Sequence, residues 1–185
     1  MKKKIAILGS TGSIGKTLIN IIDKDKNNFE IKLLTAHKDH KTLLKQAKKF
    51  NVKYLIITDK NSYQILKKKI KNLKIKLFND FSNLKTIFKY KVDYTMSAII
   101  GLNGLEPTID MIKYSKKLAI ANKESIVCGW HLIKKELNKH KTEFLPVDSE
   151  HFSIWSLIKN VNEDIEKIYI TASGGPFLKK NKKDL

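Results

Sequence analysis

A glycine-rich segment near the start of the chain has the composition of a phosphate-binding turn. It reads Gly9-Ser-Thr-Gly12-Ser-Ile-Gly15 and directly follows a short apolar run. Glycines allow a tight turn and let the backbone approach a pyrophosphate, while the first N–H groups of the next helix attract negative charge. We therefore expect a dinucleotide site here. The alternative is a turn whose glycines only allow a helix to pack closely on a strand.

The residues after the second predicted strand bear on the choice between NAD and NADP. An acidic residue at this place binds the free ribose hydroxyls of NAD, whereas positive charge suits the extra phosphate of NADP. Lys38 and Lys41 favour NADP, and Asp39 favours NAD. We expect Lys38 and Asp39 to lie beside the adenosine end of the cofactor, and we expect that cofactor to be NADPH.

A second polar motif, Ala121-Asn-Lys-Glu-Ser125, follows the predicted strand Lys117–Ile120. It therefore lies at the carboxyl end of a parallel strand, where α/β proteins bind ligands. Two structural alternatives remain open. Glu124 or Ser125 could cap a helix, and Lys123 could pair with Glu124.

A third motif, Pro146-Val-Asp-Ser-Glu-His151, carries two carboxylates two residues apart. On an extended backbone Asp148 and Glu150 can converge on one hard divalent cation, with other oxygens completing the site. The alternative is a helix cap formed by Asp148 or Ser149. We expect His151 to be structural or to lie just outside the metal ligands.

A fourth motif, Thr171-Ala-Ser-Gly-Gly-Pro-Phe177, follows the strand-like run Lys167–Ile170. The Ser173 hydroxyl and the neighbouring glycine N–H groups suit a phosphate. An ordinary turn before a proline explains the same residues equally well.

The elements that must position these motifs alternate between strand and helix. Apolar runs predict strands at Lys3–Leu8, Ile31–Ala36, Lys53–Ile57, Ile75–Phe78, Tyr94–Met96, Lys117–Ile120 and Glu143–Pro146. Helical spacing predicts helices at Ser13–Asp23, Lys41–Phe50, Ser62–Lys71, Leu84–Tyr90, Leu105–Tyr114 and Ser125–Asn138. This order indicates the α/β class: a Rossmann-like, doubly wound parallel sheet over residues 1–130. The start of an α+β catalytic domain is expected over 141–185, with the change between His131 and Lys141.

Composition limits the classes of partner. The 185 residues are 42% hydrophobic, a globular profile. The net charge is +19, but all 37 basic residues are lysine, which lacks the planar fork that reads bases. We expect a solvated basic surface and no specific nucleic acid. Cys128 is the only cysteine, so no internal disulfide can form, and no apolar stretch approaches the ~20 residues of a membrane span. A cytoplasmic protein without a membrane partner is expected.

Together and in this order, the four motifs resemble the 1-deoxy-D-xylulose 5-phosphate reductoisomerase family. The resemblance implies catalytic roles for Lys123 and Glu150, and binding of a divalent metal (Mg²⁺, Mn²⁺ or Co²⁺) by Asp148 and Glu150. It implies substrate contacts by Lys123, Ser149, Glu150 and Ser173. It implies NADPH contacts by Thr11, Gly12, Ser13, Ile14, Lys38, Asp39, Asn122 and Glu124.

The family also implies a reaction: a phosphorylated sugar, 1-deoxy-D-xylulose 5-phosphate, is rearranged and reduced to 2-C-methyl-D-erythritol 4-phosphate. Full-length members are expected to be homodimers with further site residues beyond this sequence, so we expect this chain to bind NADPH but to turn over poorly alone. His37 and Asp39 depart from the family pattern, which usually has a glycine and an amide there. The alternative is a non-catalytic nucleotide-binding module from a decayed or truncated gene.

Overall fold

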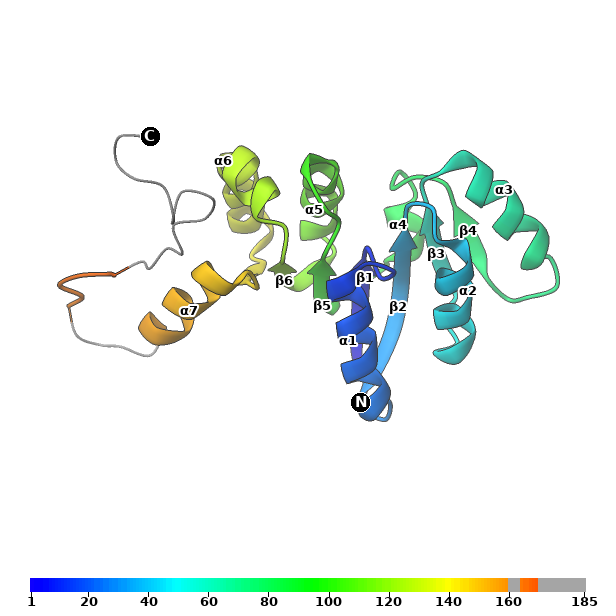
Figure 1. The fold of residues 1–185 in the computed structure, drawn as a ribbon, viewed down its shortest axis with the longest axis horizontal. Helices are drawn as coiled ribbons and strands as arrows, with labels where there is room; N and C mark the ends of the chain where they lie inside the picture. The colour runs from blue at the N-terminus through cyan, green and yellow to red at the C-terminus, as the bar shows by residue number, and fades with distance from the viewer. Residues whose placement is uncertain (160–163, 170–185) are drawn as a thin grey trace, which may run out of the picture. The chain divides into compact units, whose positions relative to one another are not determined.

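The computed structural model describes residues 1–159 and 164–169, and the chain divides into two compact units, Met1–Asp148 and Ser149–Leu185. The first unit is built on a parallel sheet with the strand order β4-β3-β2-β1-β5-β6-β7 (Figure 1). The strands are β1 (Lys3–Leu8), β2 (Phe29–Ala36), β3 (Tyr54–Ile57), β4 (Lys76–Phe78), β5 (Val92–Ser97), β6 (Ser115–Ile120) and β7 (Glu143–Pro146). The helices between them are α1 (Ser13–Lys24), α2 (His40–Lys49), α3 (Lys60–Lys69), α4 (Leu84–Ile87), α5 (Leu105–Ile112) and α6 (Lys123–His140), with a 3-10 turn, η1, at Leu102–Gly104.

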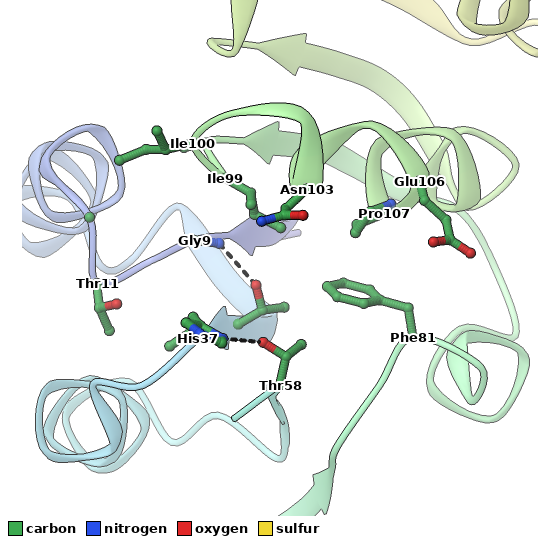
Figure 2. A pocket seen from close by; sticks show the side chains of 14 residues that line it. Gly9, Thr11, His37, Thr58, Phe81, Ile99, Ile100, Asn103, Glu106 and Pro107 are labelled. Atoms are coloured by element: carbon green, nitrogen blue, oxygen red, sulfur yellow. Dashed lines mark hydrogen bonds between the residues drawn. The ribbon is translucent and has the colours of Figure 1, made fainter. Parts of the chain in front are cut away.

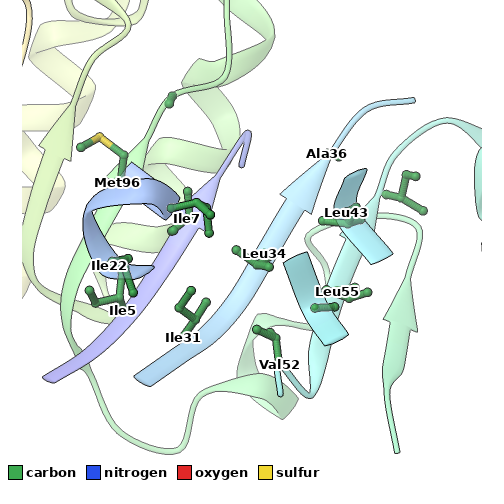
Figure 3. Close-up of a cluster of buried hydrophobic side chains, with 14 of the residues drawn as sticks. Ile5, Ile7, Ile22, Ile31, Leu34, Ala36, Leu43, Val52, Leu55 and Met96 are labelled. Carbon is green, nitrogen blue, oxygen red and sulfur yellow. The ribbon is translucent and has the colours of Figure 1, made fainter. Parts of the chain in front are cut away.

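Both faces of this sheet are buried, which explains why its strands are continuous apolar runs. Successive side chains of a strand point to opposite faces. Ile5 and Ile7 of β1 accordingly join a core cluster with α1, α2 and α3, part of which Figure 3 shows. Ala6 and Leu8 join a second cluster with α4 and α5. The predicted α/β class and doubly wound parallel sheet are confirmed.

Three helices begin at a side chain that caps the backbone. Asp39 accepts a hydrogen bond from Thr42 N at the start of α2, and Asp59 accepts one from Ser62 N at the start of α3. Asn122 does the same for α6. Such a cap satisfies one of the N–H groups that the first turn of a helix leaves without a partner. The local sequence therefore fixes where these helices start.

Two expected elements differ in the structure. The fourth helix ends at Ile87 instead of Tyr90, because Phe88 has an extended backbone and is buried against Tyr114. The strand expected at Lys167–Ile170 was wrong over its described part: residues 167–169 form no strand, and Ile170 lies outside the described residues. An apolar run forms a strand only where a neighbouring strand supplies hydrogen bonds.

The sheet extends further along the chain than the expected domain 1–130. Strand β7 pairs in parallel with β6, so α6 and β7 belong to the first compact unit. The expected start of a catalytic domain near Lys141 stays a prediction. The second unit contains helix α7 (Ser149–Ile158). Among residues 1–159 and 164–169, none of the helices combines the length and the hydropathy that a membrane span requires.

Candidate cofactor site

A cavity of about 620 Å³ opens at the carboxyl ends of the central strands. β1 pairs with β2 on one side and with β5 on the other, so the chain winds in opposite directions from this point. Such a switch point leaves a crevice in which α/β proteins bind ligands. The lining residues, most of them labelled in Figure 2, are Gly9, Thr11, Gly12, Thr35, Ala36, His37, Thr58, Phe81, Ala98, Ile99, Ile100, Asn103, Glu106 and Pro107.

The glycine turn forms one wall of the cavity. Gly9 has a φ of 78°, a left-handed conformation that favours glycine. Its N–H donates to Thr35 Oγ1 at 2.9 Å, and the N–H of Ser10 donates to the Thr35 carbonyl oxygen at 2.9 Å. The turn is therefore fastened to the end of β2.

Helix α1 starts at this turn without a side-chain cap. Its N-cap residue is Gly12, and no side chain accepts a hydrogen bond from the first turn. Helix α1 differs in this from α2, α3 and α6, in each of which a side-chain oxygen accepts a hydrogen bond from the first turn. Backbone N–H groups and the positive end of the helix dipole thus remain available beside Gly12 for an anion.

The loop after β2 contributes His37 to the lining of the cavity. His37 lines the cavity, and its Nδ1 is 2.9 Å from Thr58 Oγ1 at the end of β3 (Figure 2). The side chain of Lys38 is exposed. Asp39 caps α2: partial burial acts to raise the pKa of its carboxyl, but the hydrogen bonds from Thr42 outweigh it and hold that pKa below the usual value. Positive and negative charge thus lie side by side in this loop.

Asn122 is hydrogen-bonded to the loop that follows β5, part of which lines the cavity. It is buried, and its amide Nδ2 donates to the carbonyl oxygens of Ile99 and Gly101 at 2.6 Å each. Its Oδ1 accepts from Ser125 N at 3.0 Å. One side chain therefore shapes the loop over the cavity and starts α6, and its expected contact with the cofactor stays a prediction.

Replacing this amide should lower stability. Asn122→Ala removes three hydrogen bonds and leaves two partly buried carbonyl groups without their donor, so we expect the free energy of unfolding to fall by about 2–3 kcal/mol. Urea denaturation measures it. Asn138→Ala, at an exposed position of the same helix, should change stability by less than about 0.5 kcal/mol. Equal stabilities of the two variants would contradict this assignment.

The other predicted residues lie in three places. Ser13 and Ile14 begin α1 next to the cavity, while Lys123 and Glu124 are exposed in the first turn of α6. In the second unit, the Ser149 hydroxyl donates to Glu150 Oε2 at 2.9 Å. Ser173 lies outside the described residues.

The expected metal ligands come from the end of one unit and the start of the next. Asp148 follows β7, and Glu150 lies in the first turn of α7. Over 1–159 and 164–169, no three His, Cys, Asp or Glu side chains lie together as a metal site. The pairing of Asp148 with Glu150 stays a prediction.

Several lining residues were not predicted from the sequence. Thr35, Thr58, Phe81, Glu106 and Pro107 each follow or end a strand, or lie on the first turn of α5. Strand order was the signal that could have indicated them, because the carboxyl ends of neighbouring parallel strands meet at one edge of the sheet. The sequence predicts the strands but not which of them are neighbours.

Comparison with known families identifies the chain. A sequence model of 1-deoxy-D-xylulose 5-phosphate reductoisomerase matches residues 5–129, and a model of that enzyme's C-terminal domain matches residues 144–185. The chain belongs to the 1-deoxy-D-xylulose 5-phosphate reductoisomerase family. The reductoisomerase of Pelagibacter ubique is 61% identical over 95% of this chain and 46% of its own length, and that of Wolbachia pipientis wMel is 40% identical over 95% and 45%. The chain thus spans about half the length of these relatives.

Solved reductoisomerase structures share the fold. The reductoisomerase of Zymomonas mobilis in complex with NADPH superposes with a TM-score of 0.89 at 34% identity, over 100% of this chain and 49% of that one. A reductoisomerase in complex with NADPH, fosmidomycin and magnesium superposes with a TM-score of 0.82 at 32% identity, over 98% and 48%.

Proposed function

We propose that this chain is the NADPH-binding part of a reductoisomerase that converts 1-deoxy-D-xylulose 5-phosphate into 2-C-methyl-D-erythritol 4-phosphate. The observation that carries the proposal is the uncapped N-terminus of α1, which follows a glycine turn lining a cavity of about 620 Å³. Family membership supports it, as do relatives whose structures hold NADPH or magnesium.

The cavity fits a dinucleotide in chemistry. The N–H groups that follow Gly12 can donate to a pyrophosphate, in the segment Thr11, Gly12, Ser13 and Ile14. Lys38, in the loop after β2, would attract the ribose 2′-phosphate. The Asp39 carboxylate already accepts a hydrogen bond from Thr42 N, which lessens its repulsion of that phosphate. Apolar side chains such as Ile99 and Phe81 offer van der Waals contact to a ring. We assign NADPH to this cavity, with Asn122 and Glu124 towards its reactive end.

The metal and the substrate belong to the motifs after β6. The carboxylates of Asp148 and Glu150 are the oxygen donors that Mg²⁺ and Mn²⁺ prefer, so the donor set fits a divalent ion. When bound, such an ion supplies Lewis acidity to substrate oxygens. Lys123 would hold substrate by its charge, and Ser149 and Ser173 would hold it by their hydroxyls. These residues would orient the sugar beside the reactive end of the cofactor, which would supply the hydride.

A chimera tests this function without requiring the chain to act alone. The chain would replace the matching first part of the Pelagibacter ubique relative, with which it shares 61% identity. We expect the chimera to oxidise NADPH only when 1-deoxy-D-xylulose 5-phosphate and Mg²⁺ are both supplied. The oxidation is measured as a fall in the absorbance of NADPH near 340 nm. A chimera with Asp148→Asn should lose about a hundredfold or more in rate, because one charged ligand is lost. A folded but inactive chimera would favour the non-catalytic nucleotide-binding module.

A further inference from the structure

Every polar atom of Ser10, the second residue of the glycine turn, takes part in a hydrogen bond. It is completely buried. Its N–H donates to the Thr35 carbonyl oxygen at 2.9 Å, and its hydroxyl lies 3.3 Å from the same oxygen. Its other two hydrogen bonds are with a single side chain, that of Gln46 on α2.

The side-chain amide of Gln46 hydrogen-bonds Ser10 through both its oxygen and its nitrogen. The Ser10 hydroxyl donates to Gln46 Oε1 at 2.7 Å, and Gln46 Nε2 donates to the Ser10 carbonyl oxygen at 2.9 Å. Gln46 is buried and lies 36 residues further along the chain. Because the acceptor and the donor are both used, the orientation of the amide and the rotation of the Ser10 peptide are fixed together.

These two hydrogen bonds hold a residue of the turn that lines the cavity. Gly9, Thr11 and Gly12 line it, and Ser10 is the one buried residue between them. A rotation of the Ser10 peptide would turn the neighbouring backbone and carry the start of α1 away from its present direction. Loss of the two hydrogen bonds would also leave the buried Ser10 carbonyl without its Gln46 donor, which favours such a rearrangement.

We propose that Gln46 is a positioning residue for the cofactor, which holds the glycine turn in the conformation that receives the pyrophosphate. The inference rests on the proposed binding of NADPH in this cavity. It requires an amide at this place: methionine fills a similar volume without either hydrogen bond, and glutamate at neutral pH accepts from the Ser10 hydroxyl but cannot donate to its carbonyl.

The test compares NADPH affinity in Gln46→Met and Gln46→Glu with the unchanged chain, by nicotinamide fluorescence on protein shown to be folded by circular dichroism. We expect Kd to rise roughly tenfold or more in both variants, since a small misplacement of a binding group has effects of this size. Gln64→Met makes the same substitution at an exposed position of α3, and its Kd should stay within about twofold of the unchanged chain.

A second control separates positioning from general stability. Ile133→Val trims a buried side chain in the cluster under α6 and should lower the melting temperature without changing Kd. If Gln46→Met and Gln46→Glu bind NADPH as the unchanged chain does, the inference is wrong while the proposed function stands. If Ile133→Val weakens binding as much as the Gln46 variants do, the loss follows from lower stability and Gln46 is merely structural. If the unchanged chain binds no NADPH, the proposed function fails and the inference fails with it.

Discussion

Gly12→Asp is expected to weaken NADPH binding strongly while leaving the protein folded. A Cβ atom at Gly12 would meet only the Gly9 carbonyl oxygen at 3.5 Å, an ordinary contact, and its φ of −76° suits any residue. An aspartate there is also a favourable helix cap. The new carboxylate would occupy the N–H groups of α1 and repel a pyrophosphate. We expect Kd to rise on the order of 100-fold or more, measured by calorimetry.

The neutral isostere separates charge from size. Gly12→Asn adds nearly the same volume and also caps a helix, but it lacks the negative charge. It should therefore bind NADPH more tightly than Gly12→Asp does, and the gap should narrow as salt screens the repulsion. Equal affinities for the aspartate variant and the unchanged chain would show that the pyrophosphate does not lie at α1.

Gly15→Ala is expected to destabilise the whole first unit. A Cβ at Gly15 would lie 2.3 Å from the Gly9 carbonyl oxygen and 2.6 Å from the Cα of Ser10. Both are backbone atoms of the turn, so neither can yield as a flexible side chain would. The helix and the turn must separate, and we expect the free energy of unfolding to fall by about 2–3 kcal/mol, near the upper end of the usual cost of overpacking a core.

The same substitution three residues earlier is the matched control. Gly12→Ala meets no close atom and should change the free energy of unfolding by less than about 1 kcal/mol. Urea denaturation of both variants, followed by circular dichroism, gives the comparison. Similar stabilities for Gly15→Ala and Gly12→Ala would mean that the turn does not pack on α1 as described.

The fold was predictable because each element carries its own local signal. The runs that form β1 and β2 are apolar on both faces, as strands buried between two helix layers must be. Asp39 and Asp59 stand where helices begin. The glycine turn was predictable for the same reason, since the strand, the glycines and the helix that define it are contiguous in sequence.

Contacts made across the fold were not predictable. Gln46 lies on a lysine-rich helix, and nothing in its neighbourhood indicates that its side chain faces a turn 36 residues earlier. Thr58 and Phe81 line the cavity because β3 and β4 stand in order beyond β2. The apolar run at 167–169 shows the opposite error, where local signal predicted a strand that the structure does not form.

Titration of NADPH and of NADH into the purified chain, followed by nicotinamide fluorescence, tests the central claim most directly. The cavity with the uncapped start of α1, and with Lys38 next in sequence to the lining residue His37, predicts saturable binding of NADPH, and weaker binding of NADH, which lacks the 2′-phosphate. Binding of neither nucleotide, or tighter binding of NADH, would contradict the account.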